Sequence, residues 1–232
     1  FFVIFIFMIY VGTGKFRYFM LFVAGGLAMA GLAFVLFKDR LFNHVQVRII
    51  AWKDPWSDIS GSGYQITQSL FAIGSGGYFG SGLTKGSPDV IPVSESDFIF
   101  SAIAEELGVI FAIFLILVCF SCFISFIMIA MRVRNRFYKT MALGFAICYI
   151  FQTFLSIGGV TKFIPSTGVT IPLVSYGGSS VLSSLVMFSI MQGISTIENK
   201  EAKKIEEERR NLEQTEYGVN RVPSKRRKNR QD

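Results

Sequence analysis

The chain has 232 residues, of which 51% are hydrophobic and 17% charged, with a net charge of +7 and a mean hydropathy of +0.49. Soluble domains carry about 25% charged residues, and 19 of the 39 charged residues here lie between Glu198 and Asp232. Residues 1–197 therefore hold too few charges to cover a water-soluble globule, which excludes an ordinary soluble domain. No basic face exists outside the tail and a few short loops, which excludes nucleic acid as a partner.

Apolar stretches predict membrane-spanning helices, because a bilayer core requires about 20 apolar residues of helix. In chain order the predicted spans cover residues 1–10, 18–37, 100–131, 140–161 and 174–197. The first is too short for a complete span, and the chain begins there with Phe-Phe rather than Met. We interpret it as the end of a helix whose beginning is absent, not as a signal peptide. The predicted fold class is an all-α polytopic membrane protein.

Lysine and arginine positions predict how the spans are oriented. Basic residues gather at 15–17, between the first two spans, at 132–139, between the third and fourth, and in the tail. If these regions are cytoplasmic, residues 38–99 and 162–172 face outward. We therefore expect a membrane-embedded region at 1–197, an outer loop at about 38–99 and a charged cytoplasmic tail at 198–232.

The outer loop has the composition of an ordered segment. Residues 59–84 carry no charge but contain seven glycines, and each glycine inside a spanning helix would cost about 1 kcal/mol. We predict a short amphipathic helix at about 65–73 at the outer interface, followed by a glycine turn. Non-helical backbone at that depth persists only where it lines protein or a water-filled cavity, so we expect a cavity open to the outside.

The three cysteines, Cys119, Cys122 and Cys148, lie in predicted spans. Cys119 and Cys122 form a C-x-x-C pair, which is normally a metal or redox signal. Here no second pair accompanies it, and the surrounding run is uncharged. We therefore interpret them as packing residues of a membrane helix.

Three short elements follow one another between residues 48 and 180. They are RIIAWKDP (48–55) with GYQITQSLFAI (63–73) and glycines at 76, 77, 80 and 82; DFIF (97–100) with EELG (105–108); and PSTG (165–168) with PLVSYGGSS (172–180). In content and order they resemble the large extracellular loop, the DFIF…EELG signature and the PxTG…PxxSYGGSS element of the SEDS family, which comprises FtsW, RodA and SpoVE. Together the three elements are highly specific.

The resemblance implies a fold, an activity and partners. Members of this family are bacterial plasma-membrane proteins of about ten helices that polymerise lipid II into peptidoglycan glycan strands, so this chain would be roughly the C-terminal half. The usual partner is a single-pass class B penicillin-binding protein. A lipid II flippase and a non-catalytic scaffold of the division or elongation machinery remain alternatives.

By motif match, the resemblance implies that Asp97 is the family's catalytic aspartate. The leaving group in this polymerisation is already a stable diphosphate, so one carboxylate acting as general base toward the acceptor hydroxyl is sufficient. An alternative is structural: residues 94–97 have capping-box spacing, and an acid in the first turn of a helix is favoured by the helix dipole.

Further site candidates surround Asp97 in the sequence. Glu105 lies eight residues after Asp97, about two helical turns, so both could face one cavity. Alternatively, Glu105 stays among the lipid headgroups.

Candidate diphosphate ligands are Arg48, which matches the family's loop arginine, with Lys162 and Lys85. Each of these side chains could instead extend to the lipid headgroups. A divalent cation, Mg²⁺ or Mn²⁺, is a candidate cofactor because it would neutralise the diphosphate.

The stretch Tyr176-Gly-Gly-Ser-Ser180 allows two interpretations. Its small residues could form a turn that cradles phosphate. We favour the alternative that they allow close packing of a membrane helix against its neighbours.

Overall fold

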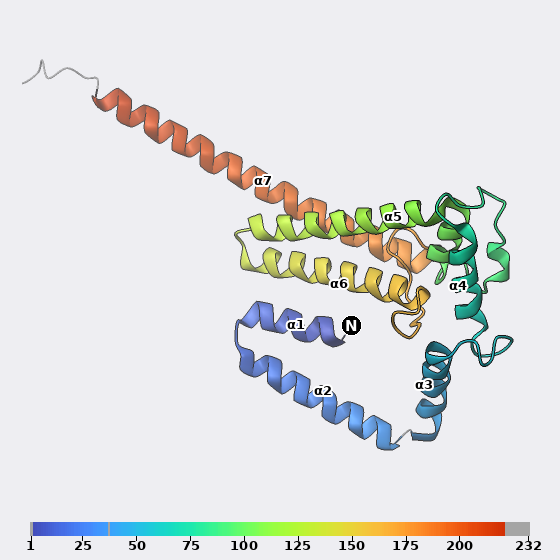
Figure 1. Ribbon diagram of the computed structural model, residues 1–232. Helices are drawn as coiled ribbons and strands as arrows, with labels where there is room; N and C mark the ends of the chain where they lie inside the picture. Colours follow the sequence, from blue (N-terminus) through green and yellow to red (C-terminus); the bar gives the residue numbers. More distant parts are fainter. Residues whose placement is uncertain (1, 37, 221–232) are drawn as a thin grey trace, which may run out of the picture.

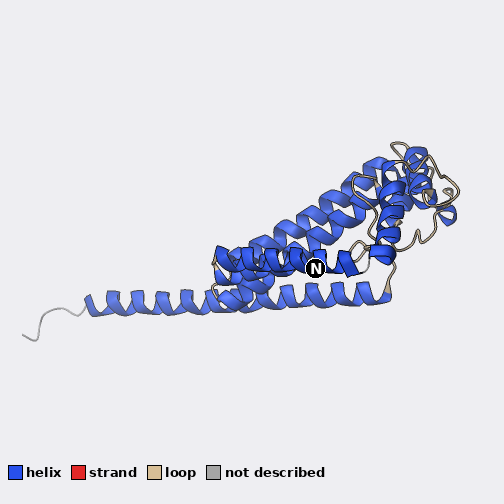
Figure 2. Cartoon of the chain, turned by 90° about the horizontal axis from the view of Figure 1, so that it is seen from below, coloured by secondary structure: helices blue, strands red, loops and turns tan. Residues whose placement is uncertain are grey.

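The computed structural model describes residues 2–36 and 38–220, and within these ranges the chain is helical with no strand (Figures 1 and 2). The helices in chain order are α1 (Phe2–Thr13), α2 (Phe16–Leu36), α3 (Lys38–Lys53), α4 (Tyr64–Gly76), the short 3₁₀-helix η1 (Pro88–Val90), α5 (Ile99–Arg132), α6 (Arg136–Val160) and α7 (Gly178–Asn220). The predicted all-α fold class is confirmed.

Four helices are long and apolar enough to cross a membrane. They are α2, α5, α6 and the part of α7 from Gly178 to Gln214, with mean hydropathies of 2.3, 3.0, 1.7 and 1.5. They coincide with four of the five predicted spans. The remaining prediction, 1–10, corresponds to α1, which has 12 residues and pairs with α2 and α6.

Helix α6 lies at the centre of the bundle and packs against α1, α5 and α7 (Figure 1). Small buried residues on α6 allow this close approach: Ala142 and Ala146 are completely buried, and a Cβ on Gly144 would collide with the Met8 side chain of α1. Because lipid supplies no hydrophobic driving force between helices, the van der Waals contact that this fit permits helps to hold them together.

An aromatic cluster joins the three C-terminal spans. Phe126 of α5, Tyr149 of α6 and Phe188 of α7 meet edge to face, with ring centroids 4.9–5.7 Å apart. This geometry suits the ring quadrupoles.

Cys119 is buried in the same apolar core and Cys122 packs against it, which agrees with the packing role predicted for both.

Helix α7 departs from the prediction at both ends. It begins at Gly178 rather than 174, because residues 171–177 form turns in which Leu173 has a φ of 64° and the Ser175 hydroxyl accepts the Ile171 N–H. It then continues without a break through residue 197 to Asn220, projecting past the other helices (Figure 1). The predicted boundary at 197 marks a change of charge within one helix, and residues 221–232 of the tail lie outside the described ranges.

The predicted outer loop contains more helix than expected. Helix α4 and the glycine turn after it confirm the prediction for this region. Helix α3 was not predicted, since its charged and polar residues give no clear apolar periodicity. Both helices lie at one end of the bundle, where the α6–α7 connection also lies (Figure 1).

Helix α5 is interrupted at Gly108, whose φ of 85° and ψ of 169° are not helical. Four backbone groups beside the break pair with the glycine loop (residues 77–82). The N–H groups of Val109 and Ile110 donate to the carbonyls of Gly77 and Tyr78, at 2.9 and 3.4 Å. The carbonyls of Glu105 and Glu106 in turn accept the N–H groups of Ser81 and Gly82, at 2.9 and 3.0 Å.

This pairing requires glycine at the crossing point. Gly80 and Gly108 both have positive φ, 79° and 85°, which L-residues with a Cβ rarely adopt. A Cβ on Gly80 would collide with the Glu106 carbonyl, and one on Gly108 with the backbone of the glycine loop.

We predict that Gly80→Ala and Gly108→Ala each destabilise the protein by about 2 kcal/mol or more, since strain and collision add. The measurement is the thermal unfolding midpoint of the purified protein in detergent. Gly74→Ala is the matched control, because a Cβ there meets nothing within 4 Å inside α4. An unchanged midpoint in both test variants would contradict the pairing described.

Candidate functional site

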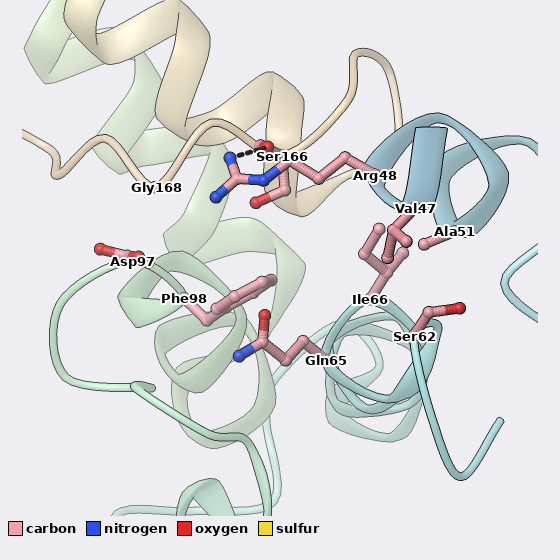
Figure 3. A pocket seen from close by; sticks show the side chains of 10 residues that line it. All are labelled: Val47, Arg48, Ala51, Ser62, Gln65, Ile66, Asp97, Phe98, Ser166 and Gly168. Atoms are coloured by element: carbon pink, nitrogen blue, oxygen red, sulfur yellow. Dashed lines mark hydrogen bonds between the residues drawn. The ribbon is translucent and has the colours of Figure 1, made fainter. Parts of the chain in front are cut away.

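A polar cavity of about 210 Å³ opens at the end of the bundle that carries α3 and α4 (Figure 3). Four segments far apart in sequence line it: α3, α4 with the turn before it, the residues just before α5, and the α6–α7 connection. Its lining residues are Val47, Arg48, Ala51, Ser62, Gln65, Ile66, Asp97, Phe98, Ser166 and Gly168. We call it the Arg48 cavity.

Helix α3 is positioned by two side chains one turn apart. The Arg48 guanidinium donates to the Ser166 carbonyl at 3.1 Å, and the Trp52 indole donates to the Lys162 carbonyl at 3.0 Å. Both acceptors belong to the α6–α7 connection. The guanidinium uses one of its five N–H groups in this bond, and its side chain extends toward the side of the cavity where Asp97 lies (Figure 3).

Helix α4 is held to the bundle by a buried hydroxyl pair. The Ser69 and Ser101 hydroxyls lie 2.6 Å apart, and Ser69 also donates to the Val160 carbonyl at 3.0 Å. Both serines are completely buried. These bonds tie α4 to α5 and α6 and so fix the face of α4 from which Gln65 points into the cavity (Figure 3).

Asp97 lies in a tight turn immediately before α5, which we call the Asp97 turn (residues 93–97). The Val93 carbonyl accepts the Asp97 N–H at 3.1 Å, and Val93 itself has a φ of 61°, which is a strained value for a β-branched residue. The Ser96 hydroxyl donates to Asp97 Oδ1 at 3.2 Å. A Cβ on Gly168 would lie 3.3 Å from Oδ2, so the glycine leaves room for the carboxylate.

The capping alternative for Asp97 is wrong. Helix α5 begins at Ile99 with Phe98 as its N-cap, no side chain makes a capping hydrogen bond, and its first turn contains no acid. Asp97 precedes the helix, and its carboxylate lines the cavity.

The sequence-predicted candidates are only partly brought together. Arg48 and Asp97 line the same cavity, although they form no direct ion pair in the described part of the chain. Lys162 does not line this cavity, and its backbone carbonyl accepts the bond from Trp52. Lys85 is exposed in the turn after the glycine loop and lines none of the cavities described.

Glu105 does not share the cavity of Asp97, contrary to the spacing argument. That argument assumed one uninterrupted helix from 97 to 105, whereas α5 begins only at Ile99. Glu105 Oε1 accepts the Ser87 N–H at 3.1 Å, and Oε2 is buried without a hydrogen-bond partner. The side chain lines a separate small cavity with Gln68 and Ser75.

The Tyr176–Ser180 stretch does not pack as predicted. A Cβ on Gly178 would meet nothing within 4 Å, so close helix packing within the chain does not require this glycine. The Ser180 hydroxyl instead lies 2.7 Å from the Thr170 hydroxyl, bracing the connection before α7. The Tyr176 ring is 76% exposed.

Sequence reasoning missed Ser62, Gln65 and Ser166 as cavity residues. Gln65 carried a usable signal, because it is a polar position on the predicted amphipathic helix. Ser62 is fixed by Asp58, whose Oδ2 accepts both its N–H and its hydroxyl, at 2.8 and 3.2 Å. Ser166 contributes through its carbonyl, for which no side-chain pattern gives a signal.

Within residues 2–36 and 38–220, no group of three or more His, Cys, Asp and Glu side chains could hold a metal ion. Asp97 is the one carboxylate among the described residues lining the Arg48 cavity. This donor set fits only a cation that takes most of its ligands from a bound substrate, as Mg²⁺ commonly does with phosphates.

The fold and the cavity define a class: a multi-pass α-helical membrane protein with a polar cavity at one end of its bundle. Residues 1–200 match the model of the FtsW/RodA/SpoVE family, described as "Cell cycle protein". The chain belongs to this family.

Curated relatives agree with this assignment. The chain is 38% identical over 193 residues to the "Peptidoglycan glycosyltransferase RodA" of Mycobacterium bovis, a match covering 82% of the chain and 40% of that protein. It is 34% identical over 184 residues to the "Probable peptidoglycan glycosyltransferase FtsW" of Aliivibrio salmonicida, covering 74% of the chain and 46% of that protein. The chain therefore spans less than half the length of these relatives.

A solved structure shares the fold. It is described as "Structural coordination of polymerization and crosslinking by a peptidoglycan synthase complex", and it matches with a TM-score of 0.63 at 22% identity. The match covers 84% of this chain and 55% of that one. At this identity the likeness shows the fold alone.

We expect Trp52→Phe to loosen α3, because it removes one of the two bonds that hold the helix and leaves the Lys162 carbonyl unpaired. Hydrogen–deuterium exchange of residues 45–53 should quicken several-fold. Trp56→Phe is the matched control, since Trp56 is 47% exposed and its ring contacts Phe71 in a tilted arrangement rather than bonding across the site. Equal exchange in the two variants would show that the indole bond does not position α3.

Proposed function

We propose that the protein is a peptidoglycan glycosyltransferase that polymerises lipid II into glycan strands, with Asp97 as general base. The observation that carries the proposal is that Asp97 and Arg48, 49 positions apart in sequence, line one polar cavity. The names of the curated relatives, peptidoglycan glycosyltransferases, support the activity.

The proposed reaction is a displacement at the anomeric carbon of the donor sugar. The acceptor hydroxyl oxygen forms a bond to this carbon while the bond from the carbon to the diphosphate oxygen breaks. Asp97 takes the hydroxyl proton, and the diphosphate departs with the bonding electron pair. Because the diphosphate is a stable anion, no acid is needed to protonate it, and a single carboxylate is sufficient.

Arg48 is the proposed partner of the diphosphate. Its planar guanidinium matches phosphate oxygens, and only one of its N–H groups is used by Ser166. If Mg²⁺ or Mn²⁺ takes part, Asp97 together with the diphosphate oxygens would hold it, and the ion would supply further neutralisation of the diphosphate charge.

The proposed orientation places the Arg48 cavity on the outer face of the bacterial plasma membrane. The basic residues between α5 and α6 and those along α7 then lie on the cytoplasmic side, as the distribution of lysine and arginine favours. The C-terminus would be cytoplasmic. Substrate with a long lipid tail would stay in the bilayer while its diphosphate and sugars reach the cavity.

A class B penicillin-binding protein is the proposed partner. This rests on the family resemblance, and the related fold occurs in what is described as a peptidoglycan synthase complex. A flippase would have no strict need of the Asp97 carboxylate, and a scaffold would need neither Asp97 nor Arg48, so the Asp97 variant below separates both alternatives from the enzyme.

We predict that Asp97→Asn lowers glycan-strand formation from labelled lipid II by about 100-fold or more, because the amide cannot accept the proton. The assay uses the whole protein with its penicillin-binding partner in membranes or detergent. Asp58→Asn is the matched control, since an amide oxygen can still accept the bonds from Ser62. Equal polymer from wild type and Asp97→Asn would discard Asp97 as the base, and no polymer from wild type would favour transport or scaffolding.

Arg48→Ala should raise the KM for lipid II about tenfold or more, since one charge-assisted hydrogen bond contributes about 1.5–3 kcal/mol. Lys85→Ala, which removes a cation placed outside the Arg48 cavity, should change the KM little. A larger effect at Lys85 than at Arg48 would mean that the diphosphate binds elsewhere.

A further inference from the structure

A second cavity, of about 510 Å³, borders the Asp97 turn. It is formed by Asp89 and residues 91–96 together with Tyr176 and Gly177, which precede α7. We call it the Tyr176 cavity. None of the features described so far accounts for it.

Asp97 connects the two cavities. The hydroxyl of Ser96, which lines the Tyr176 cavity, donates to Asp97 Oδ1 at 3.2 Å. The other oxygen, Oδ2, faces Gly168, which lines the Arg48 cavity. One carboxylate is therefore in contact with residues of both cavities, which is the arrangement required of a group that acts between two bound reactants.

The two cavities differ in charge. The Arg48 cavity contains a guanidinium suited to phosphate. Among the described residues that line the Tyr176 cavity there is no lysine or arginine; instead there are two carboxylates, Asp89 and Glu95, and the hydroxyls of Ser94 and Ser96. Carboxylates only accept hydrogen bonds when ionised. The cavity therefore disfavours a diphosphate and suits a neutral ligand rich in hydroxyl and amide donors.

Tyr176 supplies an aromatic surface for such a ligand. Its backbone N–H donates to the Glu95 carbonyl at 2.8 Å, which fixes the residue against the Asp97 turn while the ring stays 76% exposed. An aromatic ring offers a large, rigid apolar face with few rotatable bonds. The C–H face of a sugar ring can stack on it, with the sugar hydroxyls donating to the nearby carboxylates.

We propose that the Tyr176 cavity binds a neutral saccharide unit of the substrate, while the Arg48 cavity binds a diphosphate. This rests on the proposed function and deepens it, because it assigns saccharide and diphosphate to the two cavities that Asp97 connects. The sugar hydroxyl to be deprotonated would approach Asp97 from the Ser96 side.

The test measures saccharide binding separately from catalysis. The probe is a lipid-free N-acetylglucosamine tetrasaccharide, and binding to the purified whole protein carrying Asp97→Asn is followed by saturation-transfer NMR. We expect saturation transfer to the sugar protons, reduced at least fivefold by Tyr176→Ala and reduced also by Glu95→Gln. Tyr78→Ala is the matched control: its ring is 75% exposed, it lines none of the cavities described, and it should leave the signal unchanged.

Two results would overturn the proposal. One is the absence of saturation transfer to the tetrasaccharide. For this result the protein must be folded, which an unfolding midpoint equal to that of the wild type would establish. The other is an equal loss of the saturation-transfer signal with Tyr176→Ala and Tyr78→Ala. That result would mean that Tyr176 only anchors the protein at the membrane interface, as tyrosines commonly do, and does not stack on the sugar. Failure of the proposed enzyme activity would show instead as absence of polymer from wild type, whatever the tetrasaccharide result.

Discussion

The break in α5 at Gly108 is the constraint on which the rest of this end of the molecule depends. A backbone break near the membrane boundary is tolerated only if every freed N–H and carbonyl finds another partner. Here the glycine loop supplies partners for four backbone groups beside the break. It thereby fixes the end of α4 against α5, and the Ser69–Ser101 pair fixes the middle of α4 at the same place. The glycines are thus part of the scaffold and not flexible spacers.

On this scaffold the Arg48 cavity is assembled from segments that are remote in sequence. Its chemistry lies on turns and connections rather than on the spanning helices, which is common because a rigid bundle can position short irregular segments precisely. Arg48 reaches the cavity from α3, Asp97 from a strained turn, and Gly168 leaves space beside the carboxylate. The same turn borders the Tyr176 cavity, so a displacement of Asp97 would change the lining of both cavities.

Sequence patterns predicted the spans and α4 well because their signals are local. Long apolar runs identify α2, α5, α6 and α7, and amphipathic spacing followed by glycines identifies α4. Local signals failed for α3, which is held by hydrogen bonds to the α6–α7 connection, more than 100 residues later. They also failed for Glu105, since a spacing of eight residues implies a shared face only within one helix, and α5 starts after Asp97.

The sequence by itself determined that this protein is a helical membrane protein, which family it belongs to, and that Asp97 and Arg48 are its site candidates. Composition and motifs carry that information without reference to contacts. Only the tertiary structure decided that Arg48 and Asp97 share a cavity while Glu105 and Lys85 lie apart. It alone also placed Tyr176 against the Asp97 turn. The physical reason is that these relations depend on where α5 begins and breaks and on hydrogen bonds to distant backbone carbonyls, which carry no side-chain signal in the sequence.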